Sequence, residues 1–142
     1  MIERPFTRSE ARARRLDPRA TLRSVRAWVF AAARGGDARA AACAETPAAA
    51  ACALDVLMRA LSVYGRRPID ILPVCCSETT ADEARLLAAI AHAGQGADPS
   101  LCLSPFIVRR GLKSAVRAAQ AVARSDADAT DILTPYRGRA SG

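Results

Sequence analysis

Residues 46–64, TPAAAACALDVLMRALSVY, decide the fold class of this chain. Thr46 can accept hydrogen bonds from free amides at a helix start, and a proline is tolerated in the first turn because its missing N–H would have no partner there. We predict a central helix over residues 47–64 that turns Asp55 away from the core. The large apolar residues recur at spacings of three and four, which places them on one helix face: Leu54, Leu57, Met58, Leu61 and Tyr64.

Start and stop signals predict four further helices. The strongest signal is a capping box, in which the Thr80 hydroxyl accepts from the Glu83 amide and the Glu83 carboxylate reaches back to the Thr80 amide. In the first of these helices the apolar face includes Trp28, and Arg26 is expected to lie off that face. Gly111 is expected to weaken the last helix by about 1 kcal/mol relative to alanine. The expected helices cover residues 18–34, 37–43, about 80–92, and 105–125 after a Ser104-Pro105 start.

The composition favours helices throughout the chain. Alanine supplies 33 of the 142 residues and aromatic residues only 4%, and alanine is the best helix former and a poor strand former. The length fits one domain. We therefore predict an all-α, single-domain bundle of four to five helices with short loops, in which residues 69–74 form an extended connection. Residues 1–16 are expected to form a basic N-terminal arm, 17–125 the helical domain, and 126–142 a flexible C-terminal tail.

The formal charge is +7, and basic residues are concentrated at the N-terminus and in the last predicted helix. Residues 1–26 hold eight arginines against three acidic residues, so a polyanionic partner is expected to meet them first. Such charges suffice for the phosphate contacts of a nonspecific nucleic-acid binder, whereas a face of solvated arginines is the competing interpretation. The candidate polyanion contacts are Arg8, Arg12, Arg14, Arg15, Arg109, Arg110, Lys113 and Arg117.

The sequence also bears on localisation. No uncharged apolar stretch reaches the roughly 20 residues that a membrane-spanning helix needs, and no secretory or transit signal is recognisable. The five cysteines are an odd number, which fits reduced thiols better than a disulfide framework. We expect a bacterial, cytoplasmic protein.

The adjacent pair Cys75-Cys76 leaves two interpretations open. If the fold brings His92 and Cys102 alongside, the four side chains form a soft ligand set for Zn²⁺ or an iron–sulfur cluster. The spacing matches no common metal site, and free cysteines are usually small buried hydrophobic residues. Cys76 lies before a predicted helix N-terminus, which favours a reactive redox thiol over a metal site.

Two other cysteines and the single histidine are expected to have structural roles. Cys43 and Cys52 are expected to fill close contacts between alanine-rich helix faces. His92 falls in the last turn of its predicted helix, where a cation meets the helix dipole favourably. The sequence has no nucleophile elbow, P-loop or G-x-G-x-x-G motif. We therefore predict no enzymatic activity and no cofactor.

Residues 73–87, PVCCSETTADEARLL, resemble the signature of a family of small alphaproteobacterial proteins of unknown function. In that family a cysteine pair or triplet precedes a T-x-D-E-A-R-L-L helix start, and the run from Gly65 to Pro68 fits the same pattern. The resemblance implies no known activity, but it implies that the cysteine pair and the capping box belong together. Where the family has a third adjacent cysteine, this chain has Val74 or Ser77, which counts against a metal role.

Together these features predict a small, non-enzymatic helical module that offers a helix face to a protein partner. A thin alanine-rich core also favours a helix-mediated homodimer, because association would bury further apolar surface. A thiol- or metal-dependent regulator using Cys75-Cys76, and a nonspecific nucleic-acid binder using the arginine-rich arm, are the two alternatives.

Overall fold

The computed structural model describes the backbone of residues 17–141 and the side chains of residues 17–125. The described part holds six helices and no β-strand, which confirms the all-α prediction with one helix more than expected. None of these helices combines the length and the apolarity needed to cross a bilayer. The helices are α2 (Pro18–Ala33), α3 (Ala38–Cys43), α4 (Ala48–Val63), α5 (Ala81–Gly94), α6 (Ser100–Leu103) and α7 (Arg109–Ser141).

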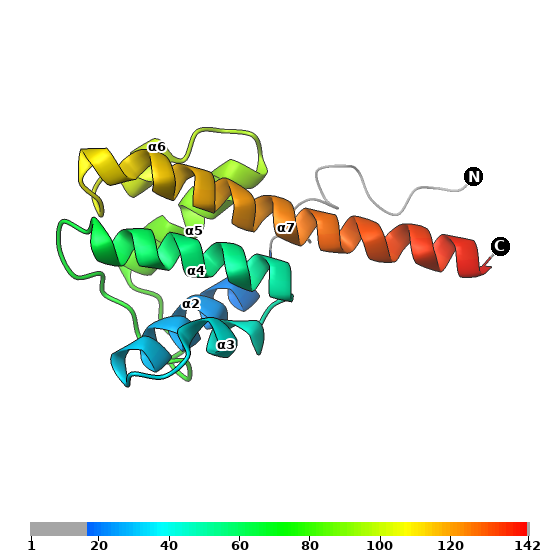
Figure 1. Cartoon of the computed structure of the whole chain (residues 1–142), viewed down its shortest axis with the longest axis horizontal. Coiled ribbons are helices and arrows are strands. Elements are labelled where there is room, and N and C mark those ends of the chain that lie inside the picture. Colours follow the sequence, from blue (N-terminus) through cyan, green and yellow to red (C-terminus); the bar gives the residue numbers. More distant parts are fainter. Residues whose placement is uncertain (1–16, 142) are drawn as a thin grey trace.

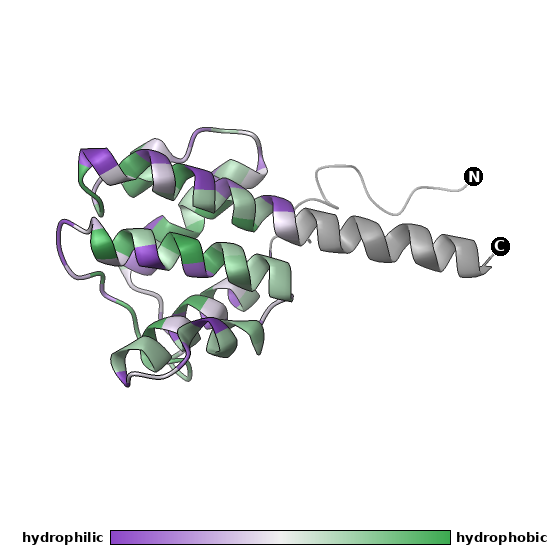
Figure 2. Cartoon of the chain, viewed as in Figure 1, coloured by the Kyte–Doolittle hydropathy of each residue, from purple (hydrophilic) through white to green (hydrophobic). Residues whose placement is uncertain are grey.

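Helix α4 lies at the centre of the bundle, as its sequence predicted. α2 and α3 cover one side of it, and α7 with α5 and α6 covers the other (Figure 1). Hydrophobic residues follow the length of α4, and hydrophilic residues gather at the first turn of α7 (Figure 2). α4 is therefore the element against which both halves of the bundle pack.

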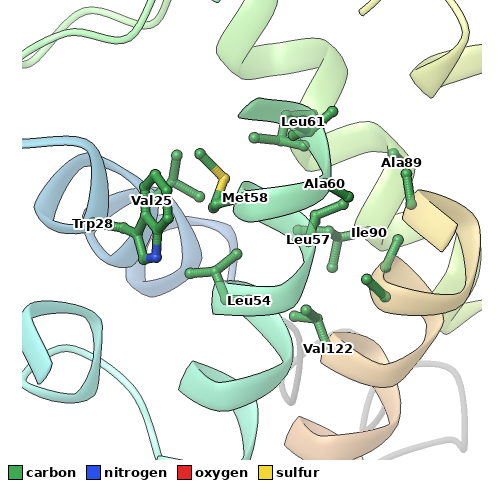
Figure 3. Close-up of a cluster of buried hydrophobic side chains, with 14 of the residues drawn as sticks. Val25, Trp28, Leu54, Leu57, Met58, Ala60, Leu61, Ala89, Ile90 and Val122 are labelled. Carbon is green, nitrogen blue, oxygen red and sulfur yellow. The ribbon is translucent and has the colours of Figure 1, made fainter. Parts of the chain in front are cut away.

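The core confirms most of the predicted apolar faces. Side chains from α2, α4, α5 and α7 converge in one buried cluster (Figure 3). Burial of each large apolar side chain contributes about 1.5–3 kcal/mol, so a few leucines can hold an otherwise alanine-rich bundle. Cluster members include Val25, Trp28, Leu54, Leu57, Met58, Leu61, Ile90 and Val122.

Two charged residues that were expected outside the core are buried. Asp55 turns toward α2 and accepts a hydrogen bond from the Trp28 indole Nε1 at 2.8 Å. Arg26 is buried against α5. Both predictions were wrong because each residue has a partner on a distant part of the chain, and periodicity within one helix carries no information on such a partner.

Three of the helix starts follow the caps predicted for them. Asp17, Asp37 and Thr80 each accept an amide hydrogen bond at the start of α2, α3 and α5, as predicted. Thr46 does not cap α4, whose N-cap position is Pro47 without a side-chain bond.

The predicted helix start at Ser104-Pro105 is also wrong. The short α6 lies there instead, with Pro99 at its N-cap position and no side-chain cap bond, and Asp98 accepts from the Ser100 amide at 3.0 Å. Phe106 and Ile107 then form a buried irregular link, and α7 begins at Arg109. Ile107 pairs with Gly65 in an isolated antiparallel bridge, so the chain is extended where we predicted helix. At its other end α7 continues to Ser141 rather than ending near residue 125.

Gly111 has a packing role that its helix propensity did not indicate. It lies under the Tyr64 side chain, and a Cβ at this position would lie 2.4 Å from both Cβ and Cγ of Tyr64. The Val108 amide donates to the Tyr64 carbonyl at 2.8 Å nearby. Glycine therefore allows the end of α4 and the start of α7 to approach closely.

The cysteines are less buried than predicted. Cys43 and Cys52 are exposed, so the expectation that they fill helix contacts is wrong. The seams between α3, α4 and α7 are filled by alanines instead, including Ala42, Ala51 and Ala119. An alanine-rich face offers so many small side chains that thiols are not needed for close packing.

Candidate functional site

A buried ion pair between Arg26 and Glu83 joins α2 to the first turn of α5. The Arg26 Nε donates to Glu83 Oε2 at 2.8 Å, and its Nη2 donates to Oε1 at 2.9 Å. Only 3% of the Arg26 side chain and none of the Glu83 side chain is exposed. Two parallel charge-assisted hydrogen bonds are a strong and directional contact. Each charge is stabilised by the other, because an unpaired charge in the protein interior costs free energy of folding.

Arg26 also holds the irregular segment 66–80, which connects α4 to α5. Its Nη1 donates to the Cys76 carbonyl at 2.7 Å, and its Nη2 donates to the Glu78 carbonyl. The hydrogen bond to Glu83 raises the pKa of Arg26. Irregular segments this long are uncommon in compact domains and usually have a functional reason. Here the segment is anchored in the protein interior.

Glu83 completes this anchoring through its carboxylate oxygens. They accept from the backbone amides of Leu72 and Thr80, each at 3.0 Å, and the Thr80 hydroxyl accepts from the Glu83 amide at 3.0 Å. Burial would raise the pKa of Glu83, but the bonds from Arg26 and from the two amides outweigh burial and lower it. The predicted capping box is thus confirmed, and its glutamate is also the partner of a distant arginine.

Asp82 binds the same segment from the adjacent position of α5. Its carboxylate accepts two bonds from Arg67, at 2.8 and 2.9 Å, and one from the Asp70 amide at 2.8 Å. These bonds, with that from Arg67 the largest contribution, lower the pKa of Asp82 to about 2. The first turn of α5 therefore fixes segment 66–80 at both of its ends.

An open groove of about 680 Å³ lies between α2, α4 and the start of segment 66–80. This volume lies within the usual range of ligand sites, about 300–1,000 Å³. Its walls are mainly apolar, with a polar edge formed by Ser62, Arg66 and Arg67. The apolar lining consists of Trp28, Val29, Ala32 and Ala33 from α2, Met58 and Leu61 from α4, and Pro68, Ile69 and Ile71 from the segment.

The wall formed by Trp28 is held in place by Asp55. Asp55 accepts from the indole Nε1 of Trp28 and, at 2.9 Å, from the Nε of Arg59. Burial would raise the pKa of Asp55, but the hydrogen bonds from Arg59 and Trp28 outweigh it and lower the pKa. The indole therefore has a fixed orientation at the groove.

Arg66 gives the groove a positive charge that residues 17–125 do not neutralise. Its Nε donates to the carbonyls of Ile107 and Ser104, at 3.0 and 3.2 Å. No carboxylate among the described side chains lies within ion-pair distance of Arg66, whereas Arg67 is paired with Asp82. The two carbonyls position the guanidinium, and among the described residues its Nη groups have no hydrogen-bond acceptor.

The predicted four-residue metal site is not formed. His92 and Cys102 do lie together, with the Cys102 Sγ 3.7 Å from the His92 Nδ1. Cys75 and Cys76 belong to the opposite end of α5, where Arg26 bridges Cys76 and the first helical turn. At 1.5 Å per residue, about 14 Å of helix separate that turn from His92. No three His, Cys, Asp or Glu side chains of the described residues gather as metal ligands would.

The structure separates the predicted polyanion contacts into two groups. Arg8, Arg12, Arg14 and Arg15 lie outside the described residues. The other four are exposed on α7, and Arg124 follows on the same face. At about 100° of rotation per residue, all five fall within an arc of about 100°. We call this surface the basic face: Arg109, Arg110, Lys113, Arg117 and Arg124.

Sequence reasoning missed Arg26 and Arg66 as site residues. A signal for Arg26 was present, because it follows Leu22 by four residues and precedes Val29 by three. Helical geometry places such a residue beside the apolar face. For Arg66 no local pattern distinguishes a residue at a groove from an ordinary exposed arginine.

No protein-family model, no curated protein and no solved structure matches this chain.

Proposed function

We propose that the protein is a non-enzymatic interaction module of the bacterial cytoplasm, whose groove binds a partner protein through an apolar segment with a neighbouring carboxylate. The observation that carries this proposal is the combination of apolar walls with the charge of Arg66, which pairs with no carboxylate of residues 17–125. Apolar side chains of the partner would leave water on entering the groove. A carboxylate beside them would accept from the free Nη groups of Arg66.

Preorganisation of the groove supports the same proposal. One wall is fixed by the Trp28–Asp55 bond, and the opposite wall is fixed by the bonds of Asp82 and Glu83 to segment 66–80. A rigid site loses little conformational entropy when a ligand binds. The hydrogen bonds around the groove therefore favour binding even though they do not contact the ligand.

The experiment is a peptide selection followed by a fluorescence titration. Peptides are selected from a displayed random library on the intact protein, and binding is measured from the emission of Trp28, the only tryptophan of the chain. We expect selected peptides to combine large apolar residues with Asp or Glu. Arg66→Gln should weaken their binding about tenfold, the effect of losing one charged hydrogen bond. Arg39→Gln, an exposed change on α3 outside the groove, should leave binding unchanged.

A second pair of variants tests the location. Ala32→Phe places a large side chain in the groove, whereas Ala40→Phe places the same side chain on the exposed surface of α3. Ala32→Phe should abolish binding and Ala40→Phe should not. Three outcomes would contradict the proposal. The selected peptides could lack acidic residues, binding could survive Ala32→Phe, or the protein could be a dimer that Ala32→Phe dissociates.

We propose a second candidate function for the basic face, which is contact with the phosphates of double-stranded DNA. The five cations are exposed, and no acidic residue lies among positions 109–125. Like charges four residues apart, such as Arg109 and Lys113, destabilise a helix. Helix stability alone therefore does not favour this arrangement, whereas a polyanionic partner does.

This candidate is tested by the salt dependence of binding to a mixed-sequence DNA duplex, measured by fluorescence anisotropy. The triple variant Arg109→Gln/Lys113→Gln/Arg117→Gln should reduce the slope of log K against log salt by about 2.7, at about 0.9 per lost phosphate contact. The control Arg19→Gln/Arg34→Gln/Arg39→Gln removes the same net charge elsewhere. Equal slopes for the two triple variants would refute a role for the basic face.

A further inference from the structure

His92 and Cys102 form a close pair that the proposed function does not use. The Cys102 Sγ lies 3.7 Å from the His92 Nδ1. His92 lies in the last turn of α5, and Cys102 lies in α6 after a short connection. His92 is the only histidine of the chain, and Cys102 is the cysteine that contacts it.

The connection between the two residues holds them in this position. The His92 carbonyl accepts from the amides of Gln95 and Ala97, at 3.1 and 2.8 Å, which turns the chain back toward α5. Asp98 then accepts from the amide and the hydroxyl of Ser100, at 3.0 and 2.6 Å. Ordered backbone on both sides of the turn keeps the sulfur beside the ring.

The pair is accessible to a small molecule. His92 is exposed, Cys102 is half-buried, and the neighbouring Leu101 is 85% exposed. The other half of the Cys102 side chain packs against the hydrophobic core. A small reagent can therefore approach the pair from solvent.

We propose that Cys102 is a modification site that reacts with low-molecular-weight disulfides, with His92 accepting the thiol proton. The thiolate attacks one sulfur of the disulfide R–S–S–R, so that a bond forms between the Cys102 Sγ and this sulfur, and the S–S bond between the two sulfurs of the reagent breaks. The electron pair leaves with the second thiolate, R–S⁻, and the proton of Cys102 passes to the His92 Nδ1. The disulfide is the oxidant, and no other reagent is needed.

The helix end assists this transfer. The C-terminal turn of α5 directs carbonyl groups toward solvent, and a cation is favoured there. Transfer of the proton produces the thiolate, which is the reactive form of cysteine. This argument does not depend on the groove or on its ligand.

The chain contains its own controls, because Cys43, Cys52 and Cys75 are exposed and have no histidine. The probe is bis(2-hydroxyethyl) disulfide, which is uncharged, so the many arginines neither attract nor repel it. The folded protein is treated for increasing times, acidified, digested, and each cysteine is quantified by mass spectrometry. Cys102 should react about tenfold faster than the exposed cysteines, because an ordinary thiol is only a few per cent thiolate at pH 7 and a neighbouring base removes this limit.

Two outcomes would overturn the proposal. One is a ranking of the cysteine reaction rates that follows side-chain exposure, or in which Cys76 reacts fastest. The other is an unchanged rate at Cys102 in His92→Gln, a change that keeps a hydrogen-bonding side chain but removes the base. In that variant we expect the reaction rate of Cys102 to fall to the rate of Cys43 or below it. The rate of Cys43 itself should not change. An unaltered thermal unfolding midpoint verifies that His92→Gln remains folded.

Discussion

Removal of the Glu83 carboxylate should be among the most destabilising single changes in this protein. Glu83→Ala leaves the Arg26 guanidinium, which is 3% exposed, with only two backbone carbonyls as partners. It also leaves the amides of Leu72 and Thr80 without the oxygens that they contact at 3.0 Å. The change therefore affects one buried charge and two backbone donors at once.

The magnitude follows from these losses. Breaking a buried ion pair costs about 3–5 kcal/mol, and an unsatisfied buried amide costs about 1–3 kcal/mol. Water entering the space left by the side chain offsets part of this, so we expect Glu83→Ala to lower the free energy of unfolding by about 4 kcal/mol. Domains of this size have a total stability of about 5–15 kcal/mol, so the variant should be close to unfolding.

The assay is urea denaturation followed by the fluorescence of Trp28, which lies in the core. The matched control is Glu45→Ala. Glu45 accepts from Arg23, also on α2, at 3.2 Å, but the two side chains are 31% and 47% exposed. Such exposed pairs contribute about 0.2–1 kcal/mol. If Glu83→Ala lowers the free energy of unfolding by no more than Glu45→Ala does, the buried pair does not hold α2 to α5.

Three further predictions use the same denaturation assay or its thermal equivalent. Gly111→Ala should lower the free energy of unfolding by about 1–3 kcal/mol, although alanine favours helices, because its Cβ would lie 2.4 Å from Tyr64; an unchanged stability would contradict this close contact. The pKa of Asp82 is about 2, below its ordinary 3.8. Asp82 therefore contributes fully to the free energy of unfolding above pH 3.8, and this contribution is lost as the pH falls from 3.8 toward about 2. The difference in Tm between the native protein and Asp82→Asn should therefore narrow over that interval, and a constant difference would refute the role of the Arg67 pair. Thr80→Ala should cost about 1 kcal/mol and Thr80→Ser much less, whereas equal losses would argue against the capping hydroxyl.

The local part of this fold was predictable from the sequence. Three helix starts depend on a side chain that bonds an amide two or three residues away, as at Asp17, Asp37 and Thr80. Both partners of such a bond lie within one short window. The apolar faces were predictable for the same reason, because their period is set by the helix itself.

The parts that failed depend on contacts between distant residues. Arg26 and Glu83 are separated by 57 positions. The contact between Gly111 and Tyr64 likewise lies between two helices that are distant in the sequence. The groove has the same origin, since Arg66 faces it only because α2 and α4 meet there. Local spacing therefore predicted the helices and His92 at a helix end, but neither its pairing with Cys102 nor the site formed by segment 66–80.

The anchoring of segment 66–80 also bears on how the molecule opens. The amides of Leu72 and Thr80 are bonded to Glu83, and the Glu83 carboxylate is held in place by Arg26 of α2. Loops ordinarily exchange their amide hydrogens with solvent through small local fluctuations. In this loop the acceptor of both amides is a fully buried side chain, so these two amides should be protected from exchange although they belong to no helix or strand.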